Sequence, residues 1–282
     1  MRATFWRRST VTAPSNLSGL RVLITRPEGR NAELGKALRD AGATVAVTPL
    51  LRITPLTDSD PEYQRARRLL LNLDHYQHLI FVSTNAVDCG MALIDSLWPQ
   101  YPIGVQCHAV GAATAAALRQ WPWPAAALTS LNHAEHGTMN SEALLALPAL
   151  QHIDQQKALI VRGCGGREHI AQTLRQRGAT VDYAECYRRD DTALSAFALQ
   201  AQLDAQRPDI VCLNSGETLQ AFCARVPASQ RGDYRLLLPS VRVADMARKA
   251  GFREIILAEN AGTAATLAAL SQWQRDHHVR QR

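Results

Sequence analysis

The sequence predicts an α/β protein built from two similar domains, each with a parallel β-sheet. Two observations support this prediction. The chain contains an ungapped internal repeat, in which residues 21–53 align with residues 157–189 at an offset of 136 positions. Short apolar runs also alternate with helical patterns along the chain, and most of these runs lack the strict two-residue alternation of a half-exposed strand. Such strands are typical of parallel sheets covered by helices on both faces.

Each copy of the repeat predicts a strand, a loop, a helix and a second strand. The apolar pairs Leu34/Leu38 and Ile170/Leu174 have the i/i+4 spacing of a buried helix face. A glycine follows each predicted helix as a C-cap, at positions 42 and 178. The identities shared by the two copies are Leu23/Leu159, Ile24/Ile160, Arg26/Arg162, Gly29/Gly165, Leu38/Leu174, Arg39/Arg175, residues 42–45 over 178–181, and Arg52/Arg188.

The repeat continues more weakly downstream. Residues 79–87 resemble 210–219, and residues 107–120 resemble 235–252, each as an apolar strand, a small polar loop and a helix. We expect final strands near 125–128 and 255–258, with closing helices at 141–147 and 263–272. Two such halves predict two flavodoxin-like domains.

The second strand of each copy is longer than an ordinary parallel strand of about five or six residues. Two long segments could cross between domains side by side and form a two-stranded ladder, at residues 49–54 and 184–189. Pro49 and Pro55 suit such a connector, because a central ladder does not tolerate proline. We therefore expect domain 1 at 20–48 plus 190–275, domain 2 at 55–183, and a disordered extension at 1–19.

The composition favours an anionic ligand. Of the 31 basic residues in this chain of net charge +6, only Lys36, Lys157 and Lys249 are lysines. Arginine pairs bidentately with carboxylates and phosphates. A GC-rich gene would give the same bias. The cluster of Arg65, Arg67 and Arg68 fits a solvated helix face better than a nucleic-acid site.

The cysteines and the N-terminus predict a cytoplasmic protein. The six cysteines form no CxxC pair, so we expect reduced thiols. No apolar stretch approaches 18 residues, and the N-terminus lacks the apolar region of a signal peptide. That segment is basic and free of acidic residues, which faintly resembles an organelle transit sequence. We favour a short extension, and no membrane or nucleic-acid partner.

Six short polar loops are candidates for the site, because ligands of parallel α/β sheets bind at the carboxyl ends of the strands. Each loop precedes a predicted helix, and a helix N-terminus attracts anions. The pattern predicts one multiply anionic ligand in a cleft between the domains. Each Ser, Thr or Asn also fits a simple helix N-cap. The loops are 25–30, 83–86, 111–114, 162–167, 214–217 and 239–242.

Several other chemistries are disfavoured. The loop at 162–167 has Gly163 and Gly165, but Glu168 replaces the third glycine of a dinucleotide fingerprint, and no Walker A Gly-Lys-Ser/Thr follows. The HxxH pairs at 75/78 and 133/136 have no accompanying cysteine or carboxylate at metal-site spacing, so we expect no metal. No GxSxG motif is present. Tyr187, next to Arg188 and Arg189, fits either a buried ring or a proton donor.

The pattern resembles the uroporphyrinogen-III synthase family from about residue 20 to residue 272. The resemblance rests on the following segments: "LITRP" (23–27), "GATVAVTPLLRI" (42–53), "IFVSTNAV" (80–87), "AVGAATAAAL" (109–118) and "VRGCGGREHIAQTLRQRGATVDYAECYRR" (161–189). It implies two flavodoxin-like domains joined by a two-stranded β-ladder, with the substrate between them.

The resemblance also implies a lyase that cyclises the linear tetrapyrrole hydroxymethylbilane, with inversion of ring D and loss of water, in haem and related tetrapyrrole biosynthesis. The substrate carries eight carboxylates, and the family uses no metal and no cofactor. It implies a monomer that could receive substrate from hydroxymethylbilane synthase. A hundredfold preference over spontaneous closure needs only about 2.7 kcal/mol, so positioning matters more than a strong acid.

Carried over residue by residue, the resemblance makes Tyr187 the candidate catalytic acid and Thr114 the threonine of a Gly-x-x-Thr loop. In the last loop this chain has "LPSVRVA" where the family form is Gly-Pro-x-Thr, which puts a threonine role there in doubt. The alternative is a two-lobed binding protein for a small anion, without catalysis. The candidate substrate-binding residues are Arg26, Ser83, Thr84, Asn85, Gly111, Thr114, Arg162, Gly163, Gly165, Asn214, Ser215, Gly216, Ser240 and Arg242.

Overall fold

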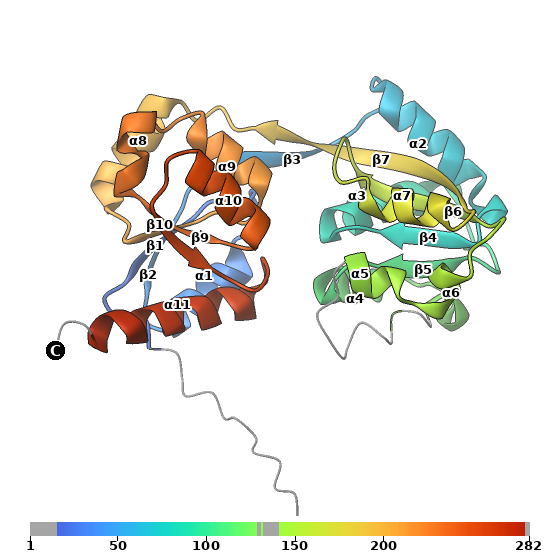
Figure 1. Cartoon of the computed structure of the whole chain (residues 1–282). Coiled ribbons are helices and arrows are strands. Elements are labelled where there is room, and N and C mark those ends of the chain that lie inside the picture. Colours follow the sequence, from blue (N-terminus) through green and yellow to red (C-terminus); the bar gives the residue numbers. More distant parts are fainter. Residues whose placement is uncertain (1–15, 129–130, 132–140, 280–282) are drawn as a thin grey trace, which may run out of the picture. The chain divides into compact units, whose positions relative to one another are not determined.

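The computed structural model describes residues 16–128, 131 and 141–279, and its contacts divide the chain into two compact units (Figure 1). Unit 1 contains the chain up to Arg52 and again from Asp190, and unit 2 contains Ile53–Arg189. Each unit is an α/β structure whose sheet is parallel apart from one edge strand in unit 2, which confirms the predicted fold class. The boundaries predicted from the sequence, 20–48 with 190–275 and 55–183, stay predictions.

The sheet of unit 1 has five strands in the order β10-β9-β8-β1-β2. All neighbouring pairs are parallel. Numbered within the unit, this order is 2-1-3-4-5, the flavodoxin-like order. The strands are β1 (Arg21–Ile24), β2 (Thr44–Val47), β8 (Ile210–Cys212), β9 (Arg235–Leu238) and β10 (Glu254–Leu257).

Helices cover both faces of this sheet because successive strand residues point to opposite sides. Val22 and Ile24 pack with α1 and α11 on one face, whereas Leu23 packs with α8, α9 and α10 on the other. The helices of unit 1 are α1 (Ala32–Asp40), α8 (Ala196–Gln206), α9 (Gly216–Cys223), α10 (Val241–Lys249) and α11 (Thr263–Val279), with the 3₁₀ helix η3 at Ala228–Asp233.

The sheet of unit 2 has the order β3-β7-β6-β4-β5. The last four strands are parallel, and β3 pairs with β7 in the opposite sense. The Leu56 N–H donates to the Cys186 carbonyl over 3.0 Å, and the Thr192 N–H donates to the Leu50 carbonyl over 3.2 Å. From the Leu50–Thr192 pair to the Leu56–Cys186 pair, the residue number rises along β3 and falls along β7, as in an antiparallel pair. The strands are β3 (Leu51–Pro55), β4 (His78–Phe81), β5 (Gln106–Ala109), β6 (Lys157–Gly163) and β7 (Thr180–Asp191).

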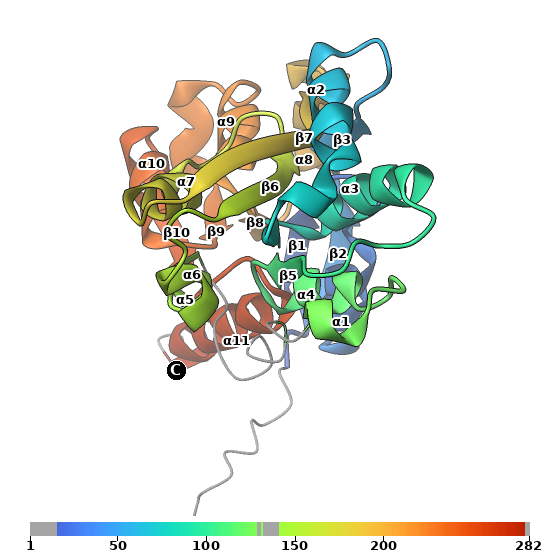
Figure 2. The ribbon, with the colours of Figure 1, turned by 90° about the vertical axis from the view of Figure 1, so that its right-hand side faces the viewer.

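Helices also cover both faces of the second sheet (Figure 2). α2, α3 and α4 pack on one face, and α5, α6 and α7 pack on the other. No helix among the described residues is long and apolar enough to span a bilayer. The helices of unit 2 are α2 (Pro61–Leu71), α3 (Thr84–Leu97), α4 (Ala112–Leu118), α5 (Ser141–Leu145), α6 (Pro148–Gln151) and α7 (His169–Gln176), with the 3₁₀ helix η1 at Leu73–His75.

The internal repeat corresponds to two copies of one strand–helix–strand unit, β1-α1-β2 and β6-α7-β7. Gly42 (φ +94°) and Gly178 (φ +88°) follow the two helices in the left-handed conformation that ends a helix. The copies differ in their second strand. β7 runs for 12 residues without a break, whereas the first copy stops at β2 and resumes at β3, on either side of Pro49. Proline lacks the N–H that a continuous ladder needs.

Two sequence-based expectations are wrong. The strand expected at 125–128 is a 3₁₀ turn, in which the Ala127 N–H donates to the Pro124 carbonyl. The proline fixes the backbone in a turn conformation. The disordered extension predicted at 1–19 is too long, because Leu17 is fully buried and its N–H donates to the Ala41 carbonyl over 2.7 Å. Residues 1–15 lie outside the described part of the chain.

A pair of buried histidines lies on adjacent strands of unit 2. His78 Nδ1 is 3.0 Å from His108 Nε2, and His78 Nε2 is 2.6 Å from the Gln156 side-chain oxygen. His108 Nδ1 is buried and has no hydrogen-bond partner among the described residues. Burial, with a smaller effect of His78, lowers the pKa of His108 to about 3, and burial also lowers the pKa of His78. Both imidazoles are therefore neutral in the folded protein at neutral pH.

We expect this pair to make folding sensitive to acid. In the unfolded chain this histidine takes up a proton near pH 6.5, whereas folded His108 does not. The contribution of neutral His108 to the free energy of unfolding is therefore complete above pH 6.5. It declines as pH falls towards 3, by at most about 1.4 kcal/mol per pH unit. Urea unfolding should show that the wild-type protein has a lower free energy of unfolding at pH 5.0 than at pH 7.5, and that this loss is smaller in His108→Gln. His75→Gln, which removes an exposed histidine, is the control and should keep the wild-type loss. An equal loss in His108→Gln would contradict the prediction.

Candidate active site

The predicted site residues lie at or near the carboxyl edges of the two sheets, and each unit holds its own set. Unit 1 has Arg26, Asn214, Ser215, Gly216, Ser240 and Arg242, and unit 2 has Ser83, Thr84, Asn85, Gly111, Thr114, Arg162, Gly163, Gly165 and Tyr187. The expected cleft between the domains stays a prediction.

Serine N-caps shape three of these loops. Ser83 Oγ accepts from the Ala86 N–H over 3.1 Å, Ser215 Oγ from the Thr218 N–H over 3.1 Å, and Ser240 Oγ from the Val243 N–H over 3.4 Å. The simple capping role that each serine allowed is thus present in the structure. Each serine is only half-buried.

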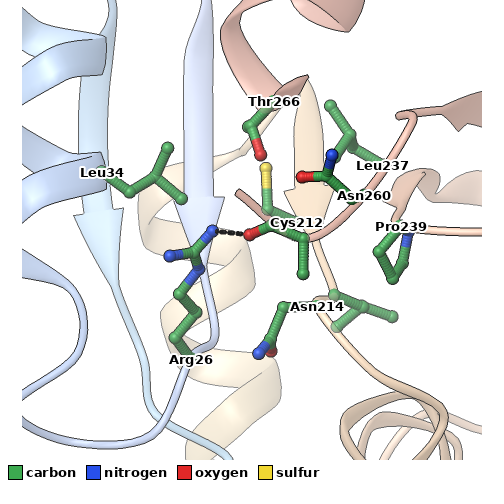
Figure 3. Close-up of a pocket in the computed structure, with 10 residues that line it drawn as sticks. Arg26, Leu34, Cys212, Asn214, Leu237, Pro239, Asn260 and Thr266 are labelled. Carbon is green, nitrogen blue, oxygen red and sulfur yellow. Dashed lines mark hydrogen bonds between the residues drawn. The ribbon is translucent and has the colours of Figure 1, made fainter. Parts of the chain in front are cut away.

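A pocket opens at the carboxyl edge of the unit 1 sheet (Figure 3). The free space inside it is about 10 Å³, and the hollow measures about 250 Å³ when the adjoining open solvent is included. The Arg26 guanidinium enters it and donates to the Ala261 backbone carbonyl, the dashed line in Figure 3. The pocket is lined by Arg26, Leu34, Cys212, Leu213, Asn214, Leu237, Pro239, Asn260, Ala261 and Thr266.

Among the residues that line this pocket, Arg26 carries the charge. Burial lowers the pKa of Arg26 from its usual value, but an arginine remains protonated at neutral pH. Burial raises the pKa of the Cys212 thiol to about 12, so the thiol is neutral and does not compensate the guanidinium.

The loops after β8 and β9 adjoin each other beside this pocket. A side chain at Gly216 would come within 3.5 Å of the Arg242 guanidinium and within 3.4 Å of Met246. Arg242 is exposed and donates to the Met246 sulfur over 3.3 Å. An exposed cation therefore lies next to the Asn214–Gly216 loop. That Arg242 binds substrate stays a prediction.

In unit 2, Tyr187 is fully buried and its hydroxyl is hydrogen-bonded. Its Oη is 3.0 Å from Ser83 Oγ and accepts from Arg189 Nη2 over 3.1 Å. The Arg189 guanidinium also lies 5.3 Å from the centre of the tyrosine ring. The two interpretations of Tyr187 are therefore not exclusive, because a buried ring carries a hydroxyl connected to a half-buried serine. That Tyr187 is the catalytic acid stays a prediction.

Arg162 was expected to bind substrate, and its surroundings contradict this expectation. The side chain is buried, and its guanidinium donates to Glu185 over 3.1 and 3.2 Å and to Glu168 over 2.9 Å. It also lies 3.8 Å from the centre of the Tyr183 ring. Two carboxylates thus neutralise this cation, so it is a structural arginine rather than a carboxylate ligand.

The glycines of the same loop also have structural roles. A side chain at Gly163 would lie 2.6 Å from a carbon of the Tyr187 ring, so only glycine leaves room for this ring. The Gly165 N–H, expected to face the substrate, donates to Glu185 over 3.2 Å. Gly163 does allow a close approach, but to a side chain of the protein itself.

The remaining predicted residues lie at the starts of α3 and α4. Thr84 and Asn85 open α3, while Gly111 (φ +92°) immediately precedes α4. Thr114 is only 4% exposed because it lies on the buried face of α4. The structure therefore does not present the Thr114 hydroxyl at the loop surface.

The histidine pairs do not form a metal centre in the described part of the chain. That part contains no group of three His, Cys, Asp or Glu residues placed to hold a metal ion. Both ring nitrogens of His78 already have partners, His108 and Gln156. His133 and His136 lie outside the described residues.

Sequence reasoning missed two residues of this arrangement. Arg189 was noticed beside Tyr187 but was not given a role, although residues two apart in a strand lie on the same face, which is the signal that could have found it. Asn260 lies in the loop between β10 and α11. The rule that selected the other strand-to-helix loops would have found it if applied to the last predicted strand.

Comparison with known proteins agrees with this architecture. Residues 32–268 match the family model described as uroporphyrinogen-III synthase HemD. The uroporphyrinogen-III synthase of Escherichia coli K12 is 32% identical over 256 residues, covering 88% of this chain and 99% of the relative. That of Proteus mirabilis is 36% identical over 183 residues, covering 64% of this chain and 86% of the relative.

Two solved structures share the fold. A mutant uroporphyrinogen III synthase from the extremely thermophilic bacterium Thermus thermophilus aligns with a TM-score of 0.57 at 18% identity, over 91% of this chain and 98% of its own. The Helicobacter pylori 26695 protein aligns with a TM-score of 0.53 at 15% identity, over 90% of this chain and 99% of its own. The family match spans most of the chain and agrees with the duplicated parallel-sheet units and their loops. The chain therefore belongs to the uroporphyrinogen-III synthase family.

Proposed function

We propose that this lyase cyclises hydroxymethylbilane to uroporphyrinogen III with inversion of ring D, and that a hydrogen-bonded chain of Arg189, Tyr187 and Ser83 assists the loss of water. The observation that carries the second part is the Tyr187 hydroxyl, held between a cation and a half-buried serine. The reaction itself follows from membership of the family.

The hydrogen-bond directions support a role for Ser83 at the substrate. Tyr187 accepts from Arg189, so its own proton is available to Ser83 Oγ, its other partner. Ser83 Oγ then accepts from Tyr187 and from the Ala86 N–H, which uses both of its lone pairs. The serine hydrogen is left to donate outward, to the departing hydroxyl. Linked hydrogen bonds polarise one another, so the neighbouring cation strengthens this donor.

Tyr187 is thereby a positioning residue in this proposal, and Ser83 is the group that contacts the substrate. The other exposed or half-buried loop residues would hold the carboxylates and fold the linear chain for one closure. These are Arg26, Thr84, Asn85, Asn214, Ser215, Ser240 and Arg242. In this proposal Arg162, Gly163, Gly165 and Thr114 do not contact the substrate. The first three already contact other groups of the protein, and Thr114 is buried.

We also propose a monomer that works in the cytoplasm and takes its substrate from hydroxymethylbilane synthase. The absence of disulfides among the described cysteines is consistent with a reducing compartment, since all six are free thiols. The instability of hydroxymethylbilane, which closes spontaneously, favours a short transfer between the two enzymes.

The isomer formed tests the function directly. Purified protein given hydroxymethylbilane should convert it to the type III isomer, separated chromatographically from type I. A sample without enzyme measures spontaneous closure. Formation of type I alone, at the rate of that sample, would contradict the proposed reaction. Calorimetric binding of simple dicarboxylates without turnover would instead support the binding-protein alternative.

The hydrogen-bonded chain predicts a pattern in three variants. Tyr187→Phe keeps the ring and removes the hydroxyl, and should lower kcat by about tenfold with little change in KM, the loss of one hydrogen bond of roughly 1.4 kcal/mol. Ser83→Ala should lower kcat at least as far, and the double variant no further. Ser96→Ala, on the exposed part of the same helix α3, is the control. A full additional loss from Tyr187→Phe in the Ser83→Ala background would contradict the chain.

The contact between Gly163 and Tyr187 predicts strong coupling. Gly163→Ala places a methyl group against a buried ring, and overpacking of this kind costs about 1–3 kcal/mol. We expect a lower melting temperature and a lower kcat, because the ring must shift away from Ser83. In a Tyr187→Leu background the added methyl has more room. The double variant should therefore lose less melting temperature than the sum of the losses in the two single variants. Additive losses would contradict the predicted coupling between Gly163 and the Tyr187 ring.

A further inference from the structure

The internal repeat places the same arginine in two different environments. Arg162 in the second copy is neutralised by Glu168 and Glu185 and covers the Tyr183 ring. At the offset of 136 residues, the first copy has Arg26 in place of the arginine. Ala32 and Pro49 take the places of the two glutamates, and Val47 that of the tyrosine. The first copy has thus kept the cation and has none of the three groups that satisfy it in the second.

The contacts of Arg26 agree with this comparison. Its guanidinium donates to the Ala261 carbonyl. The Glu33 carboxylate has a weaker electrostatic effect that raises the pKa of Arg26, but no carboxylate within the described ranges forms an ion pair with it. The side chain is half-buried and enters the unit 1 pocket. Burial has the largest effect on Arg26, and a half-buried cation without a directly paired carboxylate favours an incoming anion.

Two amides in the same pocket present donors as well. The Asn214 oxygen accepts from Thr218 Oγ1 over 3.1 Å, and the Asn260 oxygen accepts from the Gly262 N–H over 2.8 Å. Each amide therefore has its oxygen occupied, and within the part of the chain that the structure describes its NH₂ group is left for another acceptor. Figure 3 shows Arg26, Asn214 and Asn260 around the same opening, from three different loops.

The remaining walls suit an organic anion. Leu34, Leu213 and Leu237 are apolar, and burial keeps the Cys212 thiol neutral. Leu34 and Thr266 belong to the first turns of α1 and α11, so the positive ends of both helix dipoles lie close to the pocket. The lining includes no carboxylate.

We propose that this pocket binds one side-chain carboxylate of the tetrapyrrole, with Arg26 as its ion-pair partner and Asn214 and Asn260 as amide donors. This rests on the proposed function and adds Asn260 and a defined subsite to it. The carboxylate of the ligand takes the place that Glu185 and Glu168 fill beside Arg162.

Steady-state kinetics with hydroxymethylbilane test the subsite in the full chain. Arg26→Gln removes the ion pair. Asn260→Asp keeps the acceptor for the Gly262 N–H but replaces the donor with a negative charge. Both should raise KM by about tenfold or more, equivalent to about 1.4 kcal/mol, with little change in kcat. Arg39→Gln, which removes the same charge from an exposed position on α1, is the matched control and should leave KM unchanged. Melting temperatures establish that each variant is folded.

Binding of uroporphyrin III, a stable cyclic octacarboxylate, gives a second readout that needs no turnover. Its Kd should rise in Arg26→Gln and Asn260→Asp but not in Arg39→Gln. Unchanged KM and Kd in a folded Asn260→Asp and Arg26→Gln would overturn the proposal. If Arg26→Gln does not fold, the KM and Kd of Asn260→Asp alone test the proposal. A wild-type protein that binds uroporphyrin III through Arg26 but makes no type III isomer would refute the function and leave the subsite standing.

Inorganic phosphate distinguishes a substrate carboxylate from a free anion. A rise in melting temperature with phosphate that is lost in Arg26→Gln, together with unchanged KM and Kd for the tetrapyrroles, would assign the pocket to a free oxyanion and overturn the substrate assignment. Competition between phosphate and hydroxymethylbilane in the wild type, weakened in Arg26→Gln, would support it.

Discussion

The twelve-residue strand β7 is the element on which most of unit 2 depends. It closes one edge of the parallel ladder against β6 and pairs in the opposite sense with β3 on its other side. It also supplies Glu185 to Arg162, the Tyr187 hydroxyl to Ser83, and Arg189 to that hydroxyl. A register irregularity between Arg162 and Gly163 brings Tyr187 opposite Gly163, where no other residue leaves room for its ring. One strand thus links the packing of the core to the hydrogen bonds of the candidate active site.

The duplication shows how one motif can acquire two functions. Both copies keep an arginine at the end of their first strand, a residue suited to bind carboxylates. In unit 2 the carboxylates come from the protein, and the arginine becomes a buried structural element of a loop. In unit 1 Ala32 and Pro49 replace the two glutamates of unit 2, and the same arginine enters a pocket with two amide donors. The identity of the residue is the same in both, and its partners decide its role.

The chemistry inferred for this protein requires little from any single group. The preference between two ring closures is a matter of a few kcal/mol, the range that several charge-assisted hydrogen bonds provide. A buried tyrosine that orients a serine, and an arginine that holds one carboxylate, are consistent with catalysis by positioning. The loops belong to helices fixed by capping serines and by packed cores, which gives such contacts defined geometry.

The sequence by itself determined the α/β class, the duplicated strand–helix–strand unit, the loops that carry the site and the family. These features rest on local periodicity and on glycine and proline chemistry, which act within a few residues of one another. Only the tertiary structure decided which candidates are available to a ligand. Arg26 and Arg162 are equivalent in the alignment, and Glu185 lies 23 residues from Arg162, so no local pattern shows that one cation is neutralised and the other is not. Tyr187 is likewise a buried ring and a hydrogen-bonding group at once, because strands distant in sequence bring Ser83 and Gly163 against it. Long-range packing sets the partners of a side chain, and its partners set what it can still bind.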